Sequence, residues 1–297
     1  MSREPSTLIR SRGASALDVV CAGEARWDLA AQGVLGPMAT SLRFRPGGAA
    51  VSVALSLAAR GVRVGLAASL GDDTFGRALL ARVAAAGVDT AGVSLSSARS
   101  GLVLVQGMGA AARVVSYRQE EPPIVIPEAW AAPVLLLTGL SPVVAHAAAF
   151  CKAARAARRT GTLVVVDVNA RRHLWMGQDP RAIRAVMGEA DVVRCSSEDM
   201  AVLGTSAKLV RAMMRDRTVL VESGATHVRA TGPFGELVRE RTAASALRPP
   251  GSGDAFTAAM CEALARAGAA GIERLDVWAR LFHPRGQSPT IERSLRL

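Results

Sequence analysis

The chain of 297 residues can bury a large core, and its 50% hydrophobic content excludes disorder throughout. Its formal net charge of +11 comes from scattered arginines, with Lys152 and Lys208 as the lysines, so it forms no concentrated basic tract for nucleic acid. Because one Tyr and six Phe also leave few rings to stack on bases, we expect no nucleic-acid partner and a globular enzyme instead.

Apolar runs alternate with helical patterns from residue 17 onward. The patterns predict strands at residues 17–22, 64–68, 134–138, 163–167, 192–194 and 219–221, and helices at residues 50–60, 76–86, 143–159 and 181–188. The strands at 134–138 and 163–167 lack alternation between apolar and polar residues, which is typical of strands covered on both faces. The sequence therefore predicts an α/β fold with a doubly wound, mainly parallel sheet and ligands at the carboxyl ends of its strands.

Two segments, near 27–46 and 100–119, interrupt this alternation. Their polar-apolar patterning and glycine-containing turns indicate strands rather than helices. The two segments can pair as a small antiparallel β lid over a binding site, or they can be ordinary surface hairpins. A lid would expose strand edges, through which two subunits could form a homodimer.

The cysteines and histidines show no zinc-binding spacing. The cysteines are far apart and have apolar neighbours, as expected of buried thiols in a cytoplasmic protein; they are Cys21, Cys151, Cys195 and Cys261. Residues 129–151 lack charge, but Pro133, Gly139 and Pro142 favour strand, turn and helix over a membrane span. We expect no membrane partner, a disordered tail at residues 1–16 and no secretory signal.

A glycine-containing turn, Pro249-Pro250-Gly251-Ser252-Gly253-Asp254, precedes an alanine-rich helical pattern. Glycines and a helix N-terminus direct backbone N–H groups at an anion, so this turn suits phosphate. A carboxylate beside phosphate would repel it, so Asp254 is either a general base that takes a proton from an attacking hydroxyl or a plain helix cap. No GxxxxGK[ST] sequence is present, which rules out a P-loop kinase.

Two further polar clusters adjoin predicted elements. Arg45-Pro46-Gly47-Gly48 leads into a helix, and Asp167-x-Asn169-x-Arg171 follows a strand. Because the carboxyl ends of parallel strands meet at one edge of a sheet, we expect these clusters and the turn at 251–254 to line one cleft.

Several of these stretches resemble the signatures of one family. GGAAVSVA at 47–54, ASLGDDTFG at 68–76 and AGVD at 86–89 are similar to the first signature of the ribokinase family, the PfkB-type carbohydrate kinases. GSGDAF at 251–256 resembles the second signature, usually GAGDAF. Residues 167–175 resemble the DxNxRxxLW segment of fructokinase-like and 2-keto-3-deoxygluconate kinase-like members. The resemblance implies a ribokinase-like domain over residues 17–270 that uses ATP to phosphorylate a hydroxyl of a sugar or sugar acid.

The resemblance also implies roles for single residues. It makes Asp254 the catalytic base and assigns Gly251, Ser252 and Gly253 to an anion hole for the transferred phosphoryl group. It implies that a carboxylate accepts hydrogen bonds from sugar hydroxyls and that a diglycine hinge lets the lid move. The implied substrate-binding residues are Asp28, Gly47, Gly48, Ser52, Asn169 and Arg171. Two alternatives stay open, because Asp28 can be a turn residue and Arg171 can pair with Asp167.

The family binds magnesium through an NxxE motif, largely through water. The matching segment here is Ser196-Ser197-Glu198-Asp199, so Glu198 and Asp199 are the implied Mg²⁺ residues, unless they are only acidic residues at a helix start. The implied nucleotide-binding residues are Ser196, Glu222, Gly224, Gly251 and Gly253. The implied cofactors are ATP and Mg²⁺.

The chain departs from the family pattern at several positions. Ser52 replaces a sugar-binding Asn, and Glu222 begins the segment that replaces a TxG sequence near the phosphates. Residues 271–297 show no sustained helical period, so we expect this end to be shortened or replaced, with core surface left exposed. These departures leave open a degenerate member that binds sugar or nucleotide with little turnover. Trp27 and Phe44, as lid aromatics, leave open a nucleoside kinase of the same family.

Overall fold

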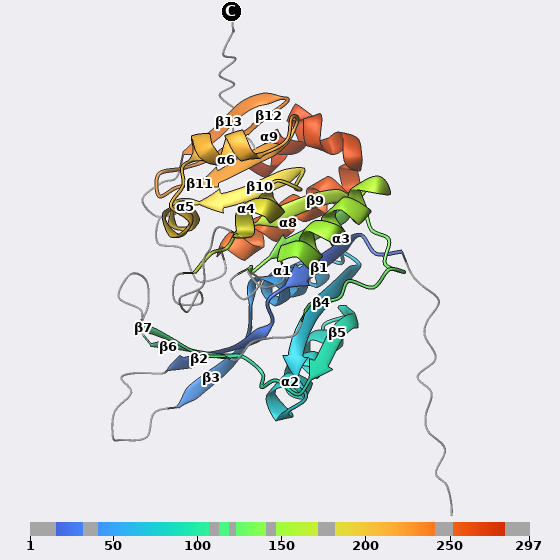
Figure 1. The fold of residues 1–297 in the computed structure, drawn as a ribbon, viewed down its shortest axis with the longest axis vertical. Helices are drawn as coiled ribbons and strands as arrows, with labels where there is room; N and C mark the ends of the chain where they lie inside the picture. The colour runs from blue at the N-terminus through green and yellow to red at the C-terminus, as the bar shows by residue number, and fades with distance from the viewer. Residues whose placement is uncertain are drawn as a thin grey trace, which may run out of the picture.

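The structure has one large sheet covered by helices and one small separate sheet (Figure 1). It is a computed structural model that describes residues 16–31, 41–106, 113–118, 123–140, 147–171, 182–240 and 252–282. Four predicted features therefore lie outside the described residues: the tail up to residue 15, residues 172–175 of the segment at 167–175, Gly251, and the end of the chain from residue 283.

The strand order of the large sheet confirms the predicted α/β fold class. Within the described residues the order is β13-β12-β11-β10-β9-β8-β1-β4-β5, parallel from β11 to β5 with an antiparallel hairpin of β12 and β13 at one edge. The chain builds outward in opposite directions from β1 and β8, which makes the sheet doubly wound. The strands are β1 (Val19–Gly23), β4 (Val64–Gly71), β5 (Asp89–Ser96), β8 (Val134–Thr138), β9 (Leu163–Asp167), β10 (Val192–Ser196), β11 (Val219–Ser223), β12 (His227–Gly232) and β13 (Gly235–Glu240).

Helices cover both faces because the strands project apolar side chains alternately to each side. On β1, Val19 and Cys21 pack in the cluster with α1 and α8, whereas Val20 and Ala22 pack in the cluster with α3 and α4. The helices are α1 (Ala49–Ala58), α2 (Thr74–Ala85), α3 (Ala147–Arg159), α4 (Ile183–Met187), α5 (Ser197–Leu203), α6 (Ala207–Met213), α8 (Ser252–Ala267), the 3-10 helix η5 (Ala269–Glu273) and α9 (Leu275–Phe282). Across the described ranges, no helix has the length and apolar character needed to cross a bilayer.

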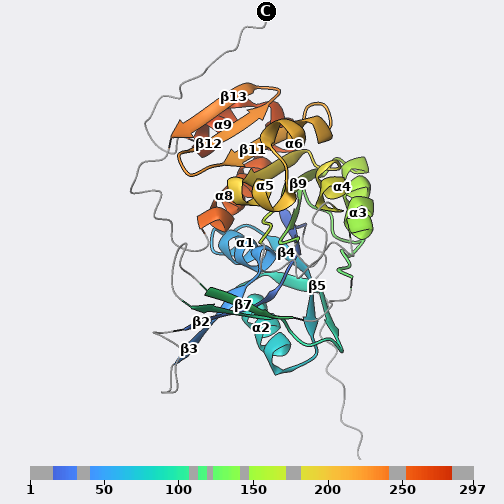
Figure 2. The ribbon, with the colours of Figure 1, turned by 60° about the vertical axis from the view of Figure 1, so that its left-hand side comes forward.

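The small sheet, called the lid sheet below, projects from the main body beside α2 (Figures 1 and 2). Its order is β3-β2-β6-β7, with β2 (Arg26–Ala31), β3 (Leu42–Gly47), β6 (Leu102–Gln106) and β7 (Arg113–Tyr117). The two predicted segments each form an antiparallel pair, but β2 and β6 between them run parallel, so the expectation of an antiparallel lid is wrong at this pair. Because α1, β4, α2 and β5 intervene in the chain, no tight turn fixes the direction of one hairpin relative to the other.

Helix α9 corrects the expectation that residues 271–297 lack a helical period. Over residues 275–282 the side chains of Val277, Trp278 and Phe282 are buried against α8 and the hairpin edge, where the ring of Trp278 stacks on Phe234 at 5.5 Å. A helical pattern of only eight residues is difficult to recognise in the sequence when proline and glycine follow it closely. Core surface expected to be exposed is therefore covered by α9.

The carboxyl ends of the parallel strands form one row of polar or small residues. Gly23, Thr138 and Asp167 are aligned across β1, β8 and β9, and Ser196 is aligned with Ser223 across β10 and β11. The N-terminus of α5 begins directly at this edge, and α8 packs against β1, β8 and β9. The fold thus brings segments far apart in the chain to one edge, where a doubly wound sheet binds its ligands.

Replacing Trp278 with Ala tests whether α9 belongs to the core. Trp278 is fully buried and its indole donates a hydrogen bond to the carbonyl of Ile272 at 3.0 Å, so we expect the free energy of unfolding to fall by about 3–5 kcal/mol. Urea unfolding measures it. Arg280→Ala on the same helix removes an exposed side chain and should change the value by less than about 0.5 kcal/mol. Similar values for the two variants would contradict the packing of α9.

Candidate active site

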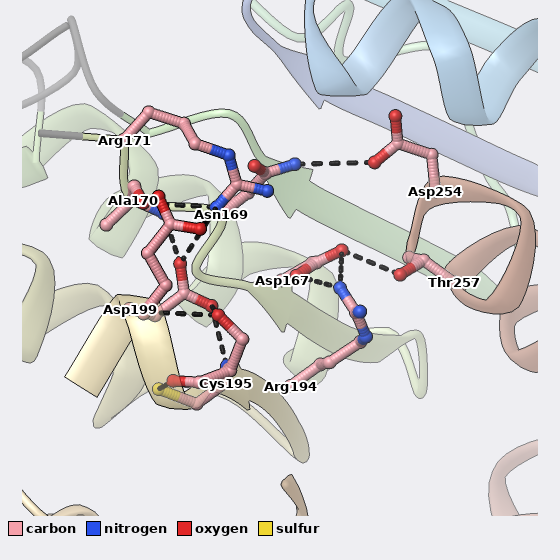
Figure 3. A network of polar contacts seen from close by, with 11 residues as sticks. Asp167, Asn169, Ala170, Arg171, Arg194, Cys195, Asp199, Asp254 and Thr257 are labelled. Atoms are coloured by element: carbon pink, nitrogen blue, oxygen red, sulfur yellow. Dashed lines mark hydrogen bonds and ion pairs between the residues drawn. The ribbon is translucent and has the colours of Figure 1, made fainter. Parts of the chain in front are cut away.

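Asp254 lies in the first turn of α8, half-buried, and faces residues from three other elements. The amide Nδ2 of Asn169 lies 3.4 Å from its Oδ1, and the two side chains point toward one another (Figure 3). A side-chain hydrogen bond also joins it to Ser52 in α1. Three residues predicted from separate parts of the sequence, Ser52, Asn169 and Asp254, are therefore in contact.

The surroundings of Asp254 favour its protonated form. Burial and the negative charge of Asp167 raise the pKa of Asp254 to about 6, although the cations Arg194 and Arg171 and the hydrogen bond to Ser52 act in the opposite direction. A carboxyl with a pKa near 6 is ionised at neutral pH and remains basic enough to accept a proton from a hydroxyl at the transition state.

A buried polar network lies beneath Asp254. Asp167 is fully buried, and both of its oxygens accept hydrogen bonds from Nη1 of Arg194, at 2.8 and 2.9 Å. Its Oδ2 also accepts a hydrogen bond from the hydroxyl of Thr257 in α8 at 2.6 Å (Figure 3). The carboxylate of Asp167 thereby joins β9, β10 and α8.

Asn169 is held by its neighbour Ala170 and by Asp199. Asn169 has a φ of +43°, a conformation that asparagine adopts more readily than most residues. The next peptide N–H, of Ala170, donates to Oδ1 of Asp199 at 2.6 Å, while Oδ2 of Asp199 accepts from the backbone and hydroxyl of Ser196, each at 2.6 Å. The cap of α5 therefore also fixes the turn that aims Asn169 at Asp254.

The two acidic residues of the predicted magnesium segment have different surroundings. Asp199 is 1% exposed and both of its oxygens accept hydrogen bonds from protein groups, whereas the side chain of Glu198 is 61% exposed. Nη1 of Arg171 lies 3.5 Å from Oδ1 of Asp199 and 3.6 Å from Oε2 of Glu198. In the described ranges no three His, Cys, Asp or Glu residues gather as a metal cage. The donor set fits an ion held mainly by phosphate and water, with Glu198 as an outer acid.

The predicted sugar-side residues gather at the join between lid sheet and main sheet. Glu24, buried directly after β1, pairs with Arg26 of β2 and with Arg118 next to β7. Arg26 also donates from Nε to Oδ1 of Asp28 at 2.9 Å. Glu24 therefore links the end of β1 to β2 and to the residue that follows β7.

The two glycines at 47 and 48 are required by this crowded join. A Cβ on Gly47 would lie 2.5 Å from the carboxylate of Asp28. Gly48 has a φ of +87°, and a Cβ there would lie 2.2 Å from the backbone oxygen of Glu24. A side chain at position 47 would displace the carboxylate of Asp28, and one at position 48 would force apart the backbones at Gly48 and Glu24.

The predicted nucleotide residues continue along the same edge. Ser196 and Ser223 are neighbours at the ends of β10 and β11, and the N–H of Gly224 donates to the carbonyl of His227 at 2.9 Å. Glu222 is aligned with Arg229 across β11 and β12. A hollow of about 450 Å³ adjoins this hairpin, lined by Thr226, His227, Arg229, Val238 and Glu240.

The structure thus divides the predicted residues into three adjacent groups along one edge. Ser52, Asn169, Arg171, Glu198, Asp199 and Asp254 surround the start of α8; Asp28, Gly47 and Gly48 lie at the lid join; Ser196, Glu222 and Gly224 lie at β10 and β11. Arg194, Thr257 and Glu24 also lie at this edge and were not predicted from the sequence. A cation within the apolar run of β10 was the one available signal for Arg194.

Replacing Asp254 with Asn should stabilise the folded protein at pH 8. The pKa of Asp254 is about 6 in the folded protein, against an ordinary value of 3.8. Between these two pH values the folded state binds a proton that the unfolded state has lost, so the free energy of unfolding falls as the pH rises from about 4 to about 6. We expect Asp254→Asn to raise the free energy of unfolding by about 2 kcal/mol at pH 8 and to have little effect at pH 4, measured by urea unfolding.

Asp276→Asn is the matched control for this titration. Two arginines, chiefly Arg274, lower the pKa of the exposed Asp276, so its replacement should not stabilise the protein at pH 8. A gain of stability in the control, or none in Asp254→Asn, would contradict the surroundings described for Asp254.

Comparison with known proteins identifies the family of the chain. An uncharacterized sugar kinase, PH1459 of Pyrococcus horikoshii, is 26% identical over 243 residues, which span 72% of each chain. A fructokinase from Xylella fastidiosa with bound ATP superposes with a TM-score of 0.75 at 24% identity over 90% of each chain. A PfkB protein from Polaromonas sp. JS666 superposes with a TM-score of 0.70 at 29% identity over 90% of this chain and 96% of its own. The pfkB carbohydrate kinase family matches residues 16–274, and the chain therefore belongs to that family.

Proposed function

We propose that the protein transfers the γ-phosphoryl group of ATP to a hydroxyl of a sugar or sugar acid, with Asp254 as general base. The observation that carries the proposal is the position of Asp254, half-buried in the first turn of α8 with a pKa raised to about 6 and in contact with Ser52 and Asn169. ATP as donor is supported by the fructokinase that binds it in the same fold.

In this mechanism Asp254 accepts the proton of the acceptor hydroxyl as its oxygen attacks phosphorus. Ser252 and Gly253 begin α8 directly before Asp254, and Gly251 precedes them in the sequence. Backbone N–H groups and the dipole at this helix N-terminus would favour the charge that builds on the transferred phosphoryl group. Gly253 suits this position, because a Cβ there would lie 3.1 Å from Nη2 of Arg194.

The acceptor is proposed to lie between Asp254 and the lid sheet. Asp28 would accept hydrogen bonds from its hydroxyls, while Ser52, Asn169 and Arg171 contact it from the main body. Gly47 and Gly48 allow the close approach of backbone to ligand that this arrangement needs. The planar cation of Arg171 suits a carboxylate, which keeps sugar acids within the proposed acceptor class.

The nucleotide is proposed to follow the row of strand ends from α8 toward β12. Ser196, Glu222 and Gly224 lie along this row, with the hollow at Thr226 and His227 beyond them. Mg²⁺ bound to the phosphates would neutralise charge during transfer. Glu198 can face such an ion through water, whereas Asp199 would first have to release its helix cap.

A nucleoside acceptor is less favoured by the position of the lid aromatics. Trp27 packs edge-on against Phe44, which in turn stacks on Phe75, and the Trp27 indole donates to the Phe75 carbonyl. These rings occupy the lid face opposite Asp28, since neighbouring residues of a strand point to opposite sides. They are therefore turned away from the proposed acceptor site.

Asp254→Asn should abolish phosphoryl transfer. With ATP, Mg²⁺ and a panel of sugars and sugar acids, the wild-type protein should release ADP, and the variant should lose about 10²–10⁴ in kcat. The wild-type kcat should fall as pH drops below about 6, because Asp254 then becomes protonated. A coupled ADP assay measures both effects, and Asp276→Asn should behave as wild type.

Two outcomes would count against this mechanism. Full activity in Asp254→Asn would remove Asp254 from the reaction. Thermal stabilisation by sugar or ATP without ADP release from any acceptor would instead support the degenerate binding protein.

We also propose that the protein forms a homodimer through the apolar face of the lid sheet. One register row on this face consists of Phe44, Leu29, Leu104 and Val115, and a second row contains Trp27, Leu102 and Tyr117. Trp27 and Leu29 are already buried in the core of the chain, so Phe44, Val115 and Tyr117 are the side chains of these rows that remain for a partner. Phe44, Val115 and Tyr117 are 43%, 46% and 58% exposed, and exposed apolar patches of this kind commonly mark protein contacts.

Val115→Arg should separate such a dimer. The wild-type protein should have twice the 30.8 kDa mass of one chain by light scattering, and the variant should have the mass of one chain because a charge cannot be buried unpaired in the interface. Leu209→Arg, an equally exposed apolar position on α6, is the control and should leave the mass unchanged. A wild-type monomer would contradict the proposal.

A further inference from the structure

The ion pair of Arg194 and Asp167 has no role in the mechanism above, although it lies directly beneath the proposed base. Both residues are buried, with Arg194 7% exposed and Asp167 fully covered. Arg194 comes from β10 and Asp167 from β9, and Thr257 adds a third contact from α8. Cys195 and Val193 on either side of Arg194 are apolar and buried, so the cation is an exception within its strand.

The stability of the fold does not by itself explain the ion pair of Arg194 and Asp167. Removing two charges from water costs free energy that their mutual attraction often only just offsets, and apolar residues of similar volume commonly serve as well. The cost is higher here because Nε of Arg194 is buried without a hydrogen-bond partner among the described residues. The location of the pair, rather than its contribution to stability, is therefore the feature to explain.

The guanidinium of Arg194 and its partner Asp167 pack against the first two turns of α8, at Gly253, Phe256 and Thr257. Nη2 lies 3.1 Å from the point where a Gly253 Cβ would be, and the guanidinium lies 5.9 Å from the centre of the Phe256 ring. Asp167 accepts the hydroxyl of Thr257, which is three residues after Asp254 and so on the same side of the helix. These contacts fix the rotation of α8 and with it the direction of the Asp254 side chain.

We propose that Arg194 is a positioning residue for phosphoryl transfer: together with Asp167 it holds the first turn of α8 so that Asp254 faces the acceptor hydroxyl. This inference rests on the proposed role of Asp254. Arg194 itself touches neither substrate nor the transferred group in this account, because it lies beneath the helix and acts through Asp167 and Thr257.

The pair also sets opposing charges next to Asp254. The charged or hydrogen-bonding groups that face Asp254 are Asp167 from β9, Asn169 and Arg171 after β9, Arg194 from β10 and Ser52 from α1. Asp167 raises the pKa of Asp254, whereas Arg194 lowers it. Removing Asp167 alone should therefore lower the pKa of Asp254. Removing Arg194 as well should raise that pKa again.

Carbon-13 NMR of labelled aspartate carboxyls measures these two changes in the pKa of Asp254 without any substrate. Assigned with Asp254→Asn, the wild-type Asp254 should titrate near pH 6. Asp167→Asn should lower the midpoint by roughly one unit, and the double variant Asp167→Asn/Arg194→Met should raise it again from that value. The double variant buries no unpaired charge, so its fold should be retained.

Kinetics test the positioning itself. The double variant should lose about 10–100-fold in kcat with little change in KM for ATP, because the base is misdirected while the nucleotide contacts remain. Arg194→Lys alone keeps the cation and should retain more activity than the double variant. Asp191→Asn/Arg215→Met removes a more exposed ion pair, with N and O 2.6 Å apart, at the opposite end of β10 and is the control.

The outcomes separate the inference from the proposed function. A wild-type titration midpoint in Asp167→Asn, or wild-type kcat in the double variant, would overturn the role of Arg194 even if Asp254→Asn is inactive. If no acceptor yields ADP, the proposed function fails while the NMR titration still decides whether the pair sets the surroundings of Asp254. If the double variant does not fold, Arg194→Lys, which keeps a cation beside Asp167, still tests the positioning through its loss of kcat.

Discussion

The carboxylate of Asp167 is the contact on which the candidate site depends. It lies fully buried at the end of β9 and accepts hydrogen bonds from Arg194 of β10 and Thr257 of α8. A buried carboxylate must be satisfied on most of its oxygen lone pairs, so these partners are constrained in position as well as in charge. The start of α8 is thereby held against two strand ends, and the direction of Asp254 follows from it.

The same edge combines rigid and adaptable parts. Asn169 is fixed by the cap of α5, because Asp199 binds both Ser196 and the peptide of Ala170. The lid sheet instead joins the main body through Glu24 with its two arginines and through two glycines with no room for side chains. An acceptor bound between them would meet a preorganised base on one side and a separate sheet on the other.

The fold and the site were predictable from the sequence to different extents. The alternation of strands and helices predicted the doubly wound sheet, and the glycine-containing turn predicted the start of α8. Short elements at the periphery, such as β5, α5, α6 and the β12–β13 hairpin, gave no clear periodic signal. Helix α9 was missed because its burial depends on α8 and β13, which a local pattern does not record.

The sequence by itself determined which residue types occur in which turns: an acid after two glycines at a helix start, a diglycine before α1 and a DxNxR run after a strand. It could not determine that Ser52, Asn169 and Asp254 meet, nor that the pKa of Asp254 rises to about 6. Proton affinity depends on burial and on charges contributed by β9 and β10, which are remote from Asp254 in the chain. Only the tertiary structure brings Asp167 and Arg194 beneath α8 and so decides how that acid behaves.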